Sequence, residues 1–121
     1  MEVNKIYKKR MITKWEAVYY QLLSYCFFNK IQLSEADLNC IVLFSLNKYN
    51  NISEFCNKVC DEKIFKTPQS VRNSINKIVK KGLLLKDKKN KKHIINPNIG
   101  LISDGNILLN YNFLAVETNK S

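Results

Sequence analysis

The sequence contains no uninterrupted apolar stretch long enough to cross a lipid bilayer. Its N-terminus is basic, but the apolar segment that follows is broken by Glu16, Gln21 and Ser24 and has no small-residue cleavage site. These absences exclude the patterns of a membrane span and of a secretory signal. We therefore expect a protein with no membrane partner, located in the cytoplasm or in a particle assembled there.

Signatures of catalysis are also missing. The chain has a single histidine, His93, which lies beside lysines rather than beside a carboxylate. There is no nucleophile elbow, no phosphate-binding loop and no group of residues with metal-ligand spacing. The sequence therefore predicts a protein that is not an enzyme and that needs no cofactor.

The four cysteines, Cys26, Cys40, Cys56 and Cys60, form no Cys-x-x-Cys pair, and each lies among apolar residues. Because Cys56 and Cys60 are four residues apart, one helix face could carry them as metal ligands, with His93 as the imidazole that completes the site. Free thiols in a hydrophobic core are the simpler interpretation, because cysteine is among the most buried residue types. We expect neither a disulfide framework nor a metal site.

Positive charge, by contrast, is plentiful and concentrated. Residues 63–92 contain eleven lysines or arginines and one acid, Asp87, a difference of +10 that equals the formal net charge of the whole chain. The rest of the chain is balanced, although residues 1–14 carry five bases and one acid. Such clustering is typical of proteins that bind DNA or RNA. The alternative is a lysine-rich surface that is simply solvated.

The basic region is predicted to begin with a helix over residues 68–81. Thr67 can cap it, Pro68 suits its first position, and Gly82 can take the left-handed conformation that ends it. One face is apolar and contains Val71, Ile75, Ile78 and Val79. The opposite face is polar and contains Gln69, Asn73, Asn76, Lys77 and Lys80.

A β-hairpin is predicted after this helix. The apolar residues 83–85 precede a lysine-rich turn at residues 86–92, and Ile94 and Ile95 resume the apolar pattern. We expect residues 83–86 to pair with residues 92–95 in antiparallel orientation. A polar-faced helix followed at once by a basic hairpin can place side chains in the major groove of DNA and lysines on the phosphates beside it.

Three further helices are expected. The first, residues 14–28, is strongly aromatic, so Trp15, Tyr19, Leu22 and Tyr25 belong either to the core or to a homodimer or partner surface. The second begins at Ser34 and is apolar nearly all round, which is typical of a central buried helix. The third spans residues 51–62. The expected shared core consists of Leu38, Ile41, Val42, Phe55, Val59, Val71, Ile75 and Ile78.

The overall prediction is an α+β protein that is mainly α. Residues 1–13 form a basic arm, residues 14–116 form a single domain with its core at 34–97, and residues 117–121 form a polar tail. Residues 96–100 are expected to be a loop. Residues 106–116 alternate apolar and polar side chains, which indicates a C-terminal strand that could also contact a partner, with a short helix as the alternative.

Residues 34–97 resemble winged helix-turn-helix proteins, in the group of MarR-like bacterial regulators and plasmid or phage replication initiators. The resemblance depends on Ser70-Val71-Arg72-Asn73, on residues 78–84, and on the hairpin closed by Ile95-Asn96-Pro97. It implies binding of double-stranded DNA, often by dimers. Carried over to this chain, it implies base or phosphate contacts from Gln69, Ser70, Arg72, Asn73 and Asn76, and wing contacts from Lys88, Lys89, Lys91 and Lys92.

Composition adds a hint of origin. Lysine outnumbers arginine eighteen to two, and lysine, asparagine and isoleucine, whose codons are rich in A and T, are abundant. In this respect the chain resembles small proteins of tailed phages with low-GC genomes. Two functions are therefore expected to compete. One is a DNA-binding transcriptional regulator or replication accessory, and the other is a structural or interaction protein, such as a virion component, that uses a winged helix for protein packing.

Overall fold

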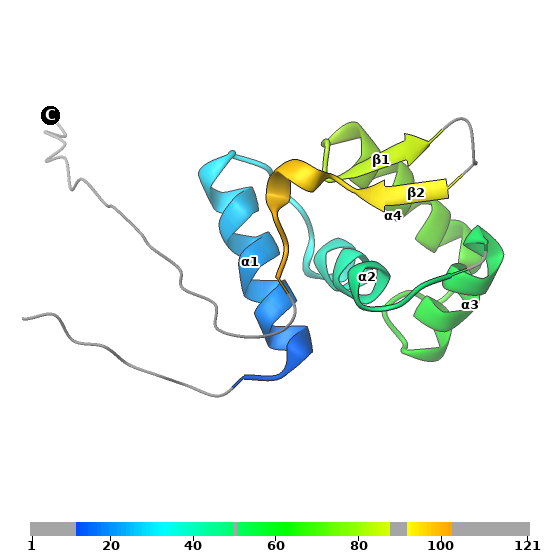
Figure 1. The fold of residues 1–121 in the computed structure, drawn as a ribbon. Helices are drawn as coiled ribbons and strands as arrows, with labels where there is room; N and C mark the ends of the chain where they lie inside the picture. The colour runs from blue at the N-terminus through cyan, green and yellow to red at the C-terminus, as the bar shows by residue number, and fades with distance from the viewer. Residues whose placement is uncertain (1–11, 50, 88–91, 103–121) are drawn as a thin grey trace, which may run out of the picture.

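The computed structural model describes residues 12–49, 51–87 and 92–102. Within them the chain is mainly helical and carries one small two-stranded antiparallel sheet (Figure 1). The elements in order are α1 (Lys14–Phe28), α2 (Glu35–Leu46), α3 (Ile52–Asp61), α4 (Pro68–Lys80), β1 (Leu84–Asp87), β2 (Lys92–Ile95) and the 3-10 helix η1 (Pro97–Ile99). This confirms the predicted mainly helical α+β class. The predicted basic arm up to residue 11 and the predicted strand at 106–116 lie outside the described residues.

Helix α1 begins with a reciprocal capping box. The Thr13 side chain accepts a hydrogen bond from the backbone N–H of Glu16, whose carboxylate in turn accepts one from the Thr13 backbone. At the other end Lys30 takes a left-handed conformation with φ of 55°. The backbone N–H groups of Lys30 and Ile31 then satisfy carbonyls of the last turn. These caps explain why α1 has the bounds expected from the sequence.

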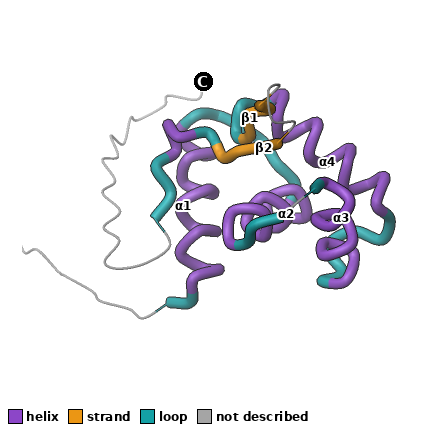
Figure 2. Tube along the Cα trace, turned by 45° about the vertical axis from the view of Figure 1, so that its right-hand side comes forward, coloured by secondary structure: helices purple, strands orange, loops and turns teal. Residues whose placement is uncertain are grey.

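Helix α2 is the centre of the molecule. Figures 1 and 2 both show it between α1 on one side and α3 with α4 on the other. Its buried residues are Asp37, Leu38, Cys40, Ile41, Val42 and Leu43, which cover most of its circumference. Because it has neighbours on both sides, it needs apolar side chains nearly all round, as the sequence indicated.

A single hydrophobic core joins all four helices to the hairpin. All eight residues expected in it are buried, and Val18 and Leu22 of α1, Cys56 of α3 and Leu83 and Leu84 of the hairpin join them. Phe55 is the largest of the fully buried side chains. Burial of this apolar surface is the main contribution that holds the helices at their mutual angles.

The turn from α3 to α4 is closed in the same way as the end of α1. Lys63 has a φ of 59°, and the backbone N–H groups of Lys63 and Ile64 bond to carbonyls of Cys60 and Val59. Thr67 then caps α4 by accepting a hydrogen bond from the Ser70 backbone, and Pro68 occupies the first turn. The sequence signals for this helix start are therefore confirmed.

The hairpin follows α4 through Gly82, whose φ of 82° ends the helix. Its register pairs Leu84 with Ile95 and Asp87 with Lys92. The first strand begins at Leu84 rather than at the expected residue 83. The reason is that the Leu83 backbone N–H still bonds to the Ile78 carbonyl as part of the helix-ending turn.

The segment after the hairpin returns to α1. It was expected to be a loop, but residues 97–99 form the short 3-10 helix η1, which begins where the Asn96 side chain accepts a hydrogen bond from the Asn98 backbone. Farther on, the backbone N–H and carbonyl of Ile102 bond to the side chain of Gln21 on α1. Among the described helices, none has both the length and the apolar character needed to span a membrane.

Candidate nucleic-acid interface

The exposed face of α4 consists of five polar side chains. Because Val71, Ile75 and Ile78 are anchored in the core, the 3.6-residue period turns the opposite positions outward. These positions are Gln69, Asn73, Asn76, Lys77 and Lys80, and all five are exposed. The Gln69 side-chain amide donates a 3.0 Å hydrogen bond to the Asn73 side-chain oxygen. No acidic residue occurs anywhere in α4, so this face is suited to a negatively charged surface.

Two other residues expected to contact DNA lie at the margins of this face. Ser70 is half-buried, and its hydroxyl is 2.9 Å from that of Thr67 at the start of the helix. Arg72 is also half-buried, and its Nη2 donates a 3.2 Å hydrogen bond to the Ser53 hydroxyl on α3. Arg72 therefore links α4 to α3, whereas the Ser70 hydroxyl contacts the residue that caps its own helix.

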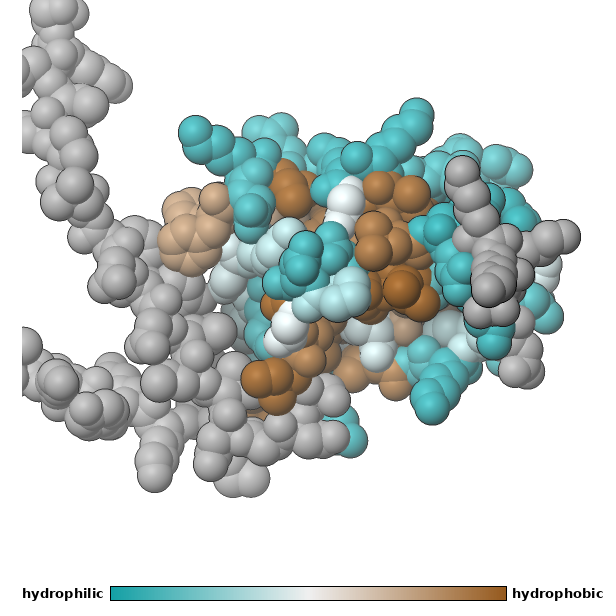
Figure 3. All heavy atoms as spheres, turned by 45° about the horizontal axis from the view of Figure 1, so that its top comes forward, coloured by the Kyte–Doolittle hydropathy of each residue, from teal (hydrophilic) through white to brown (hydrophobic). Residues whose placement is uncertain are grey.

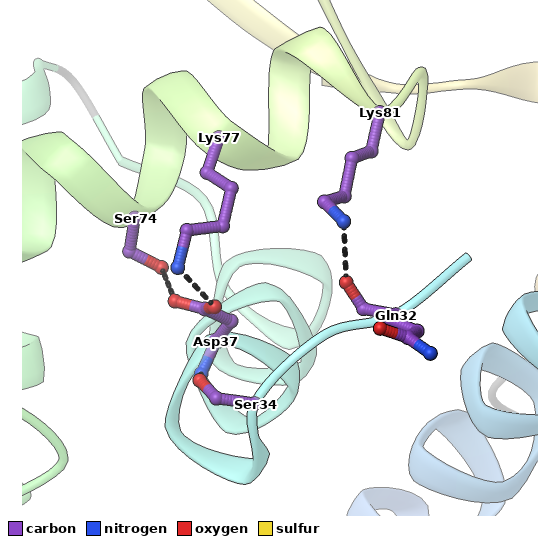
Figure 4. A network of polar contacts seen from close by, with 6 residues as sticks. All are labelled: Gln32, Ser34, Asp37, Ser74, Lys77 and Lys81. Atoms are coloured by element: carbon purple, nitrogen blue, oxygen red, sulfur yellow. Dashed lines mark hydrogen bonds and ion pairs between the residues drawn. The ribbon is translucent and has the colours of Figure 1, made fainter.

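A buried carboxylate links α4 to the central helix (Figure 4). Asp37 of α2 is 2 % exposed and accepts hydrogen bonds from Ser74 Oγ at 2.7 Å and from Lys77 Nζ at 2.9 Å. Burial alone would raise the pKa of Asp37, but hydrogen bonds from Ser74, Lys77 and Ser34 and the charge of Lys77 outweigh it and lower the pKa below 3.8. The carboxylate is therefore ionised at neutral pH.

The lysine at the C-cap of α4 holds the segment that precedes α2. Lys81 Nζ donates a 2.6 Å hydrogen bond to the backbone carbonyl of Gln32 (Figure 4). Together with the Lys77–Asp37 pair, this contact fixes one side of α4 against α2 and its leading loop. Lys77 is thus both a residue of the exposed face, with its side chain 52 % exposed, and a partner of a buried acid.

Sequence reasoning did not find the structural role of Asp37. The backbone N–H of Asp37 donates to Ser34 Oγ at 3.1 Å, which is the local contact expected in the first turn of a helix capped by serine. A usable signal was present, because Asp37 is an acid within a helix that is otherwise largely apolar. A buried acid of this kind needs a cation or hydrogen-bond donors from elsewhere in the fold.

The hairpin presents two different faces beside α4. Leu84 points into the core, while Leu85 and Ile94, which are paired across the strands, are 41 % and 46 % exposed. Figure 3 looks onto this side of the molecule and shows brown apolar side chains bordered by hydrophilic ones. Of the four lysines expected in the turn, Lys92 is described and exposed, whereas Lys88, Lys89 and Lys91 lie outside the described residues.

A cleft of about 960 Å³ opens between α4, the hairpin and the chain around the α2–α3 connection. Its apolar lining includes the rings of Phe44, Tyr49 and Phe55. Its cationic lining residues are Lys48, Arg72, Lys86 and Lys92. Sequence analysis did not foresee this cleft, because its walls come from segments that are far apart along the chain.

His93 of β2 also lines this cleft. It is opposite Lys86 in the hairpin register. Partial burial lowers the pKa of His93 below 6.5, and the positive charge of Lys86 lowers it further. The imidazole is therefore neutral at pH 7 and offers one hydrogen-bond donor and one acceptor.

The aromatic helix α1 has a different exposed surface from the one expected. Leu22 is fully buried, and Trp15, Tyr19 and Tyr25 are partly buried against the core. The exposed apolar side chains of α1 are Tyr20, Leu23, Phe27 and Phe28, with Phe27 67 % exposed. Leu22 has no accessible side-chain surface left for a partner, so any contact made by α1 would use the second group.

The four cysteines are free, and three of them are buried. Burial raises the pKa of Cys40 to about 12 and also raises the pKa of the Cys26 and Cys56 thiols. These thiols stay protonated at neutral pH. Among the described residues, no cluster of three or more His, Cys, Asp or Glu side chains could hold a metal ion.

Comparison with known proteins adds no relative to this description. No family model matches the chain, and neither a curated protein nor a solved structure matches it. The function is therefore proposed from the arrangement of α4, the hairpin and the cleft.

Proposed function

We propose that the protein is a winged helix-turn-helix protein that binds double-stranded DNA, acting as a transcriptional regulator or replication accessory. In this proposal α3 and α4 are the helix-turn-helix, α4 enters the major groove, and the hairpin is the wing. The activity is recognition alone, with no bond made or broken. The dimensions of the major groove suit one α-helix with its side chains.

The observation that carries the proposal is the exposed face of α4. It combines three amides, Gln69, Asn73 and Asn76, with the cations Lys77 and Lys80, and it lacks acidic residues. Amide side chains can bond in pairs to an adenine edge, and lysines can contact phosphates. This composition supports a face that reads bases at its centre and is held by the DNA backbone at its edges.

The position of the hairpin supports the same proposal. It packs against α4 through β1, so its lysine-rich turn follows directly from the proposed recognition helix. Lys92 is exposed at the start of β2. Because the excess positive charge of the chain lies in residues 63–92, the electrostatic attraction for DNA is concentrated on these two elements.

Under this proposal Arg72 must leave its present hydrogen-bond partner before it can contact a base. It can read guanine only if its guanidinium leaves Ser53, to which it is bonded in the absence of DNA. Asn73 and Asn76 are already exposed, and although Asn73 Oδ1 accepts a hydrogen bond from Gln69, an amide oxygen can accept a second one, so neither asparagine needs such a release. We therefore assign the primary base contacts to the two asparagines and a conditional one to Arg72.

The deciding experiment is titration of a pool of labelled duplexes at several salt concentrations. Binding that weakens steeply with salt, and that selects a subset of sequences from the pool, supports a sequence-specific DNA-binding protein. Salt-dependent binding without any selection would leave only a non-specific polyanion binder. Absence of binding at low salt would reject the proposal.

A second candidate function follows from α1. Phe27 and Phe28 are 67 % and 50 % exposed on the same helix as the exposed Leu23. Exposed apolar side chains gathered on one element are typical of protein interaction surfaces. The protein would then be a dimer subunit or a structural component, for example of a phage particle. Sedimentation of the wild type and of the double variant Leu23→Ser, Phe27→Ser over a concentration series tests this. A concentration-dependent mass that the variant loses would support it.

A further inference from the structure

We propose that the cleft between α4, the hairpin and the α2–α3 connection binds one unpaired nucleotide. Phe44 and Tyr49 would contact the base, and Lys48 and Lys86 would hold the phosphate. The inference deepens the proposed DNA binding, since it implies a preference for duplexes that carry an unpaired base beside the site. It depends on the chemistry of the cleft lining.

The aromatic part of the cleft is a cluster of three rings. The ring centroids of Phe44 and Tyr49 are 6.3 Å apart with planes 30° from parallel, and Phe55 packs against both, its centroid 5.2 Å and 4.8 Å away. Phe55 is 1 % exposed, whereas Phe44 and Tyr49 are only partly buried. Partly exposed rings held by edge-type contacts with a buried ring are suited to stacking a base, whatever its identity.

The charges of the cleft are all of one sign. Lys48, Arg72, Lys86 and Lys92 line it, and no acidic residue does so among the described residues. Arg72 donates a hydrogen bond to the neutral Ser53 hydroxyl and keeps its charge, so it adds to the positive charge of the three lysines. These cations attract an anion and repel a metal cation, which favours a ligand that carries negative charge.

Hydrogen-bonding groups are the third component of the lining. Asn51 and Asn76 supply exposed side-chain N–H donors, while the Asn51 Oδ1 accepts a hydrogen bond from the Glu54 backbone as the cap of α3, and the neutral His93 supplies a donor and an acceptor. A small inorganic anion would use the lysines and the amide N–H groups but not the rings. A nucleotide uses all three, because it joins a flat hydrogen-bonding base to a phosphate.

The test uses 2-aminopurine, a fluorescent base that is quenched when it stacks. The full-length protein is titrated into a duplex with a 2-aminopurine in a single-stranded overhang, into the same duplex with blunt ends, into the single strand, and into 2-aminopurine deoxyribonucleoside monophosphate. We expect quenching in the overhang and binding about tenfold tighter than to the blunt duplex. If the fluorescence of the monophosphate is quenched at a similar protein concentration, the ligand of the cleft is a free nucleotide. Quenching only within a strand would identify it as DNA.

Matched variants separate the cleft from the exposed face of α4. Lys48→Glu should abolish the quenching and the tenfold preference, while Lys30→Glu, with the same charge change on the turn after α1, should keep both. Lys80→Glu should weaken binding to the blunt duplex but preserve quenching by the single strand. If the wild type quenches the single strand without binding the blunt duplex, the cleft inference holds and the duplex proposal fails.

Three results would overturn the inference. One is saturation of the overhang duplex with unchanged 2-aminopurine fluorescence. Another is equal quenching, and an equal preference for the overhang duplex, in Lys48→Glu and Lys30→Glu. The third is binding of a glutamate-rich peptide that depends on Lys48, with no quenching by any nucleotide, because the cleft would then be a site for acidic peptides.

Discussion

Lys77 Nζ lies 2.9 Å from Oδ2 of Asp37, so a cation of the exposed face of α4 is anchored to a carboxylate that is almost completely buried on α2. The carboxylate also accepts a hydrogen bond from Ser74 one turn earlier in α4. Asp37 is therefore bonded to two residues of the same helix. This contact fixes the rotation of α4 about its own axis, and with it the direction in which Asn73 and Asn76 point.

Removal of the Asp37 carboxylate should destabilise the protein. In Asp37→Ala the buried Ser74 hydroxyl loses its charged acceptor, and we expect the free energy of unfolding to fall by about 1.5–3 kcal/mol. Lys77→Ala is the matched variant on the other side of the pair. Because Lys77→Ala leaves the buried carboxylate with its hydrogen bonds from Ser74 and Ser34 but without its cation, it should also cost about 1–3 kcal/mol. Urea unfolding of the two variants beside the wild type measures both values, and a loss indistinguishable from zero for either variant would contradict the contribution of the pair.

Stability should also depend on the ionisation of Asp37 at acid pH. The pKa of this carboxyl is lower in the folded protein than its ordinary value of 3.8, so below 3.8 the unfolded chain binds more protons than the folded one. The resulting stabilisation is complete above pH 3.8 and is lost as the pH falls through the folded pKa. Asp37→Asn should lack this component. Unfolding curves of both proteins between pH 2 and pH 5 would show converging stabilities toward low pH, and parallel curves would exclude the linkage.

The left-handed conformation of Lys30 should allow a stabilising substitution. A residue with a Cβ is strained at a φ of 55°, and Lys30 ends α1 in the same geometry in which Gly82 follows α4. We expect Lys30→Gly to raise the free energy of unfolding by about 1 kcal/mol. Lys30→Ala, which keeps the Cβ, should show no such gain, and Gly82→Ala should be destabilising. Thermal unfolding of the three variants provides the comparison. A similar gain from Lys30→Ala would show that the lysine side chain, rather than the backbone, is the source of strain.

The elements that could be predicted from the sequence are those with local signals. Thr67, Pro68 and Gly82 mark the two ends of α4 through backbone capping, which depends only on neighbouring residues. The hairpin and the eight core positions followed from periodicity in the same way. In each case the information lay within one or two turns of the chain.

Features formed by distant residues could not be predicted. Asp37 and Ser74 are 37 positions apart, and only the packing of α2 against α4 brings them together. The cleft likewise joins residues near 50 to residues near 90. The orientation of α1 was ambiguous for another reason. Its apolar residues cover more than one face, so periodicity alone did not distinguish the buried Leu22 from the exposed Phe27.

If α4 and the hairpin bind DNA as proposed, the salt dependence of binding and the preference for particular bases should depend on different residues. The two elements offer about 4–6 phosphate contacts, so the slope of log K against log salt should be about −4 to −5. These contacts come from Lys77, Lys80, Lys88, Lys89, Lys91 and Lys92. Replacing Lys89 and Lys91 by alanine should flatten this slope by about two and weaken binding to all sequences alike. Lys30→Ala, on the turn after α1, is the control and should leave the slope unchanged.

Asn73→Ala should instead relax discrimination at one base pair, by about 1–3 kcal/mol, with the salt slope preserved. The physical reason is that an amide reads a base edge, whereas it neutralises no phosphate and so releases no counterion. Asn73 lies at the centre of the exposed face, and its Oδ1 accepts a hydrogen bond from Gln69, so Gln69→Ala should produce a weaker effect at the same base pair. Titration of a duplex pool by each variant at several salt concentrations measures both quantities. If Asn73→Ala left the sequence preference intact while the lysine variants abolished binding, α4 would not be reading bases, and the face would serve only to attract the DNA backbone.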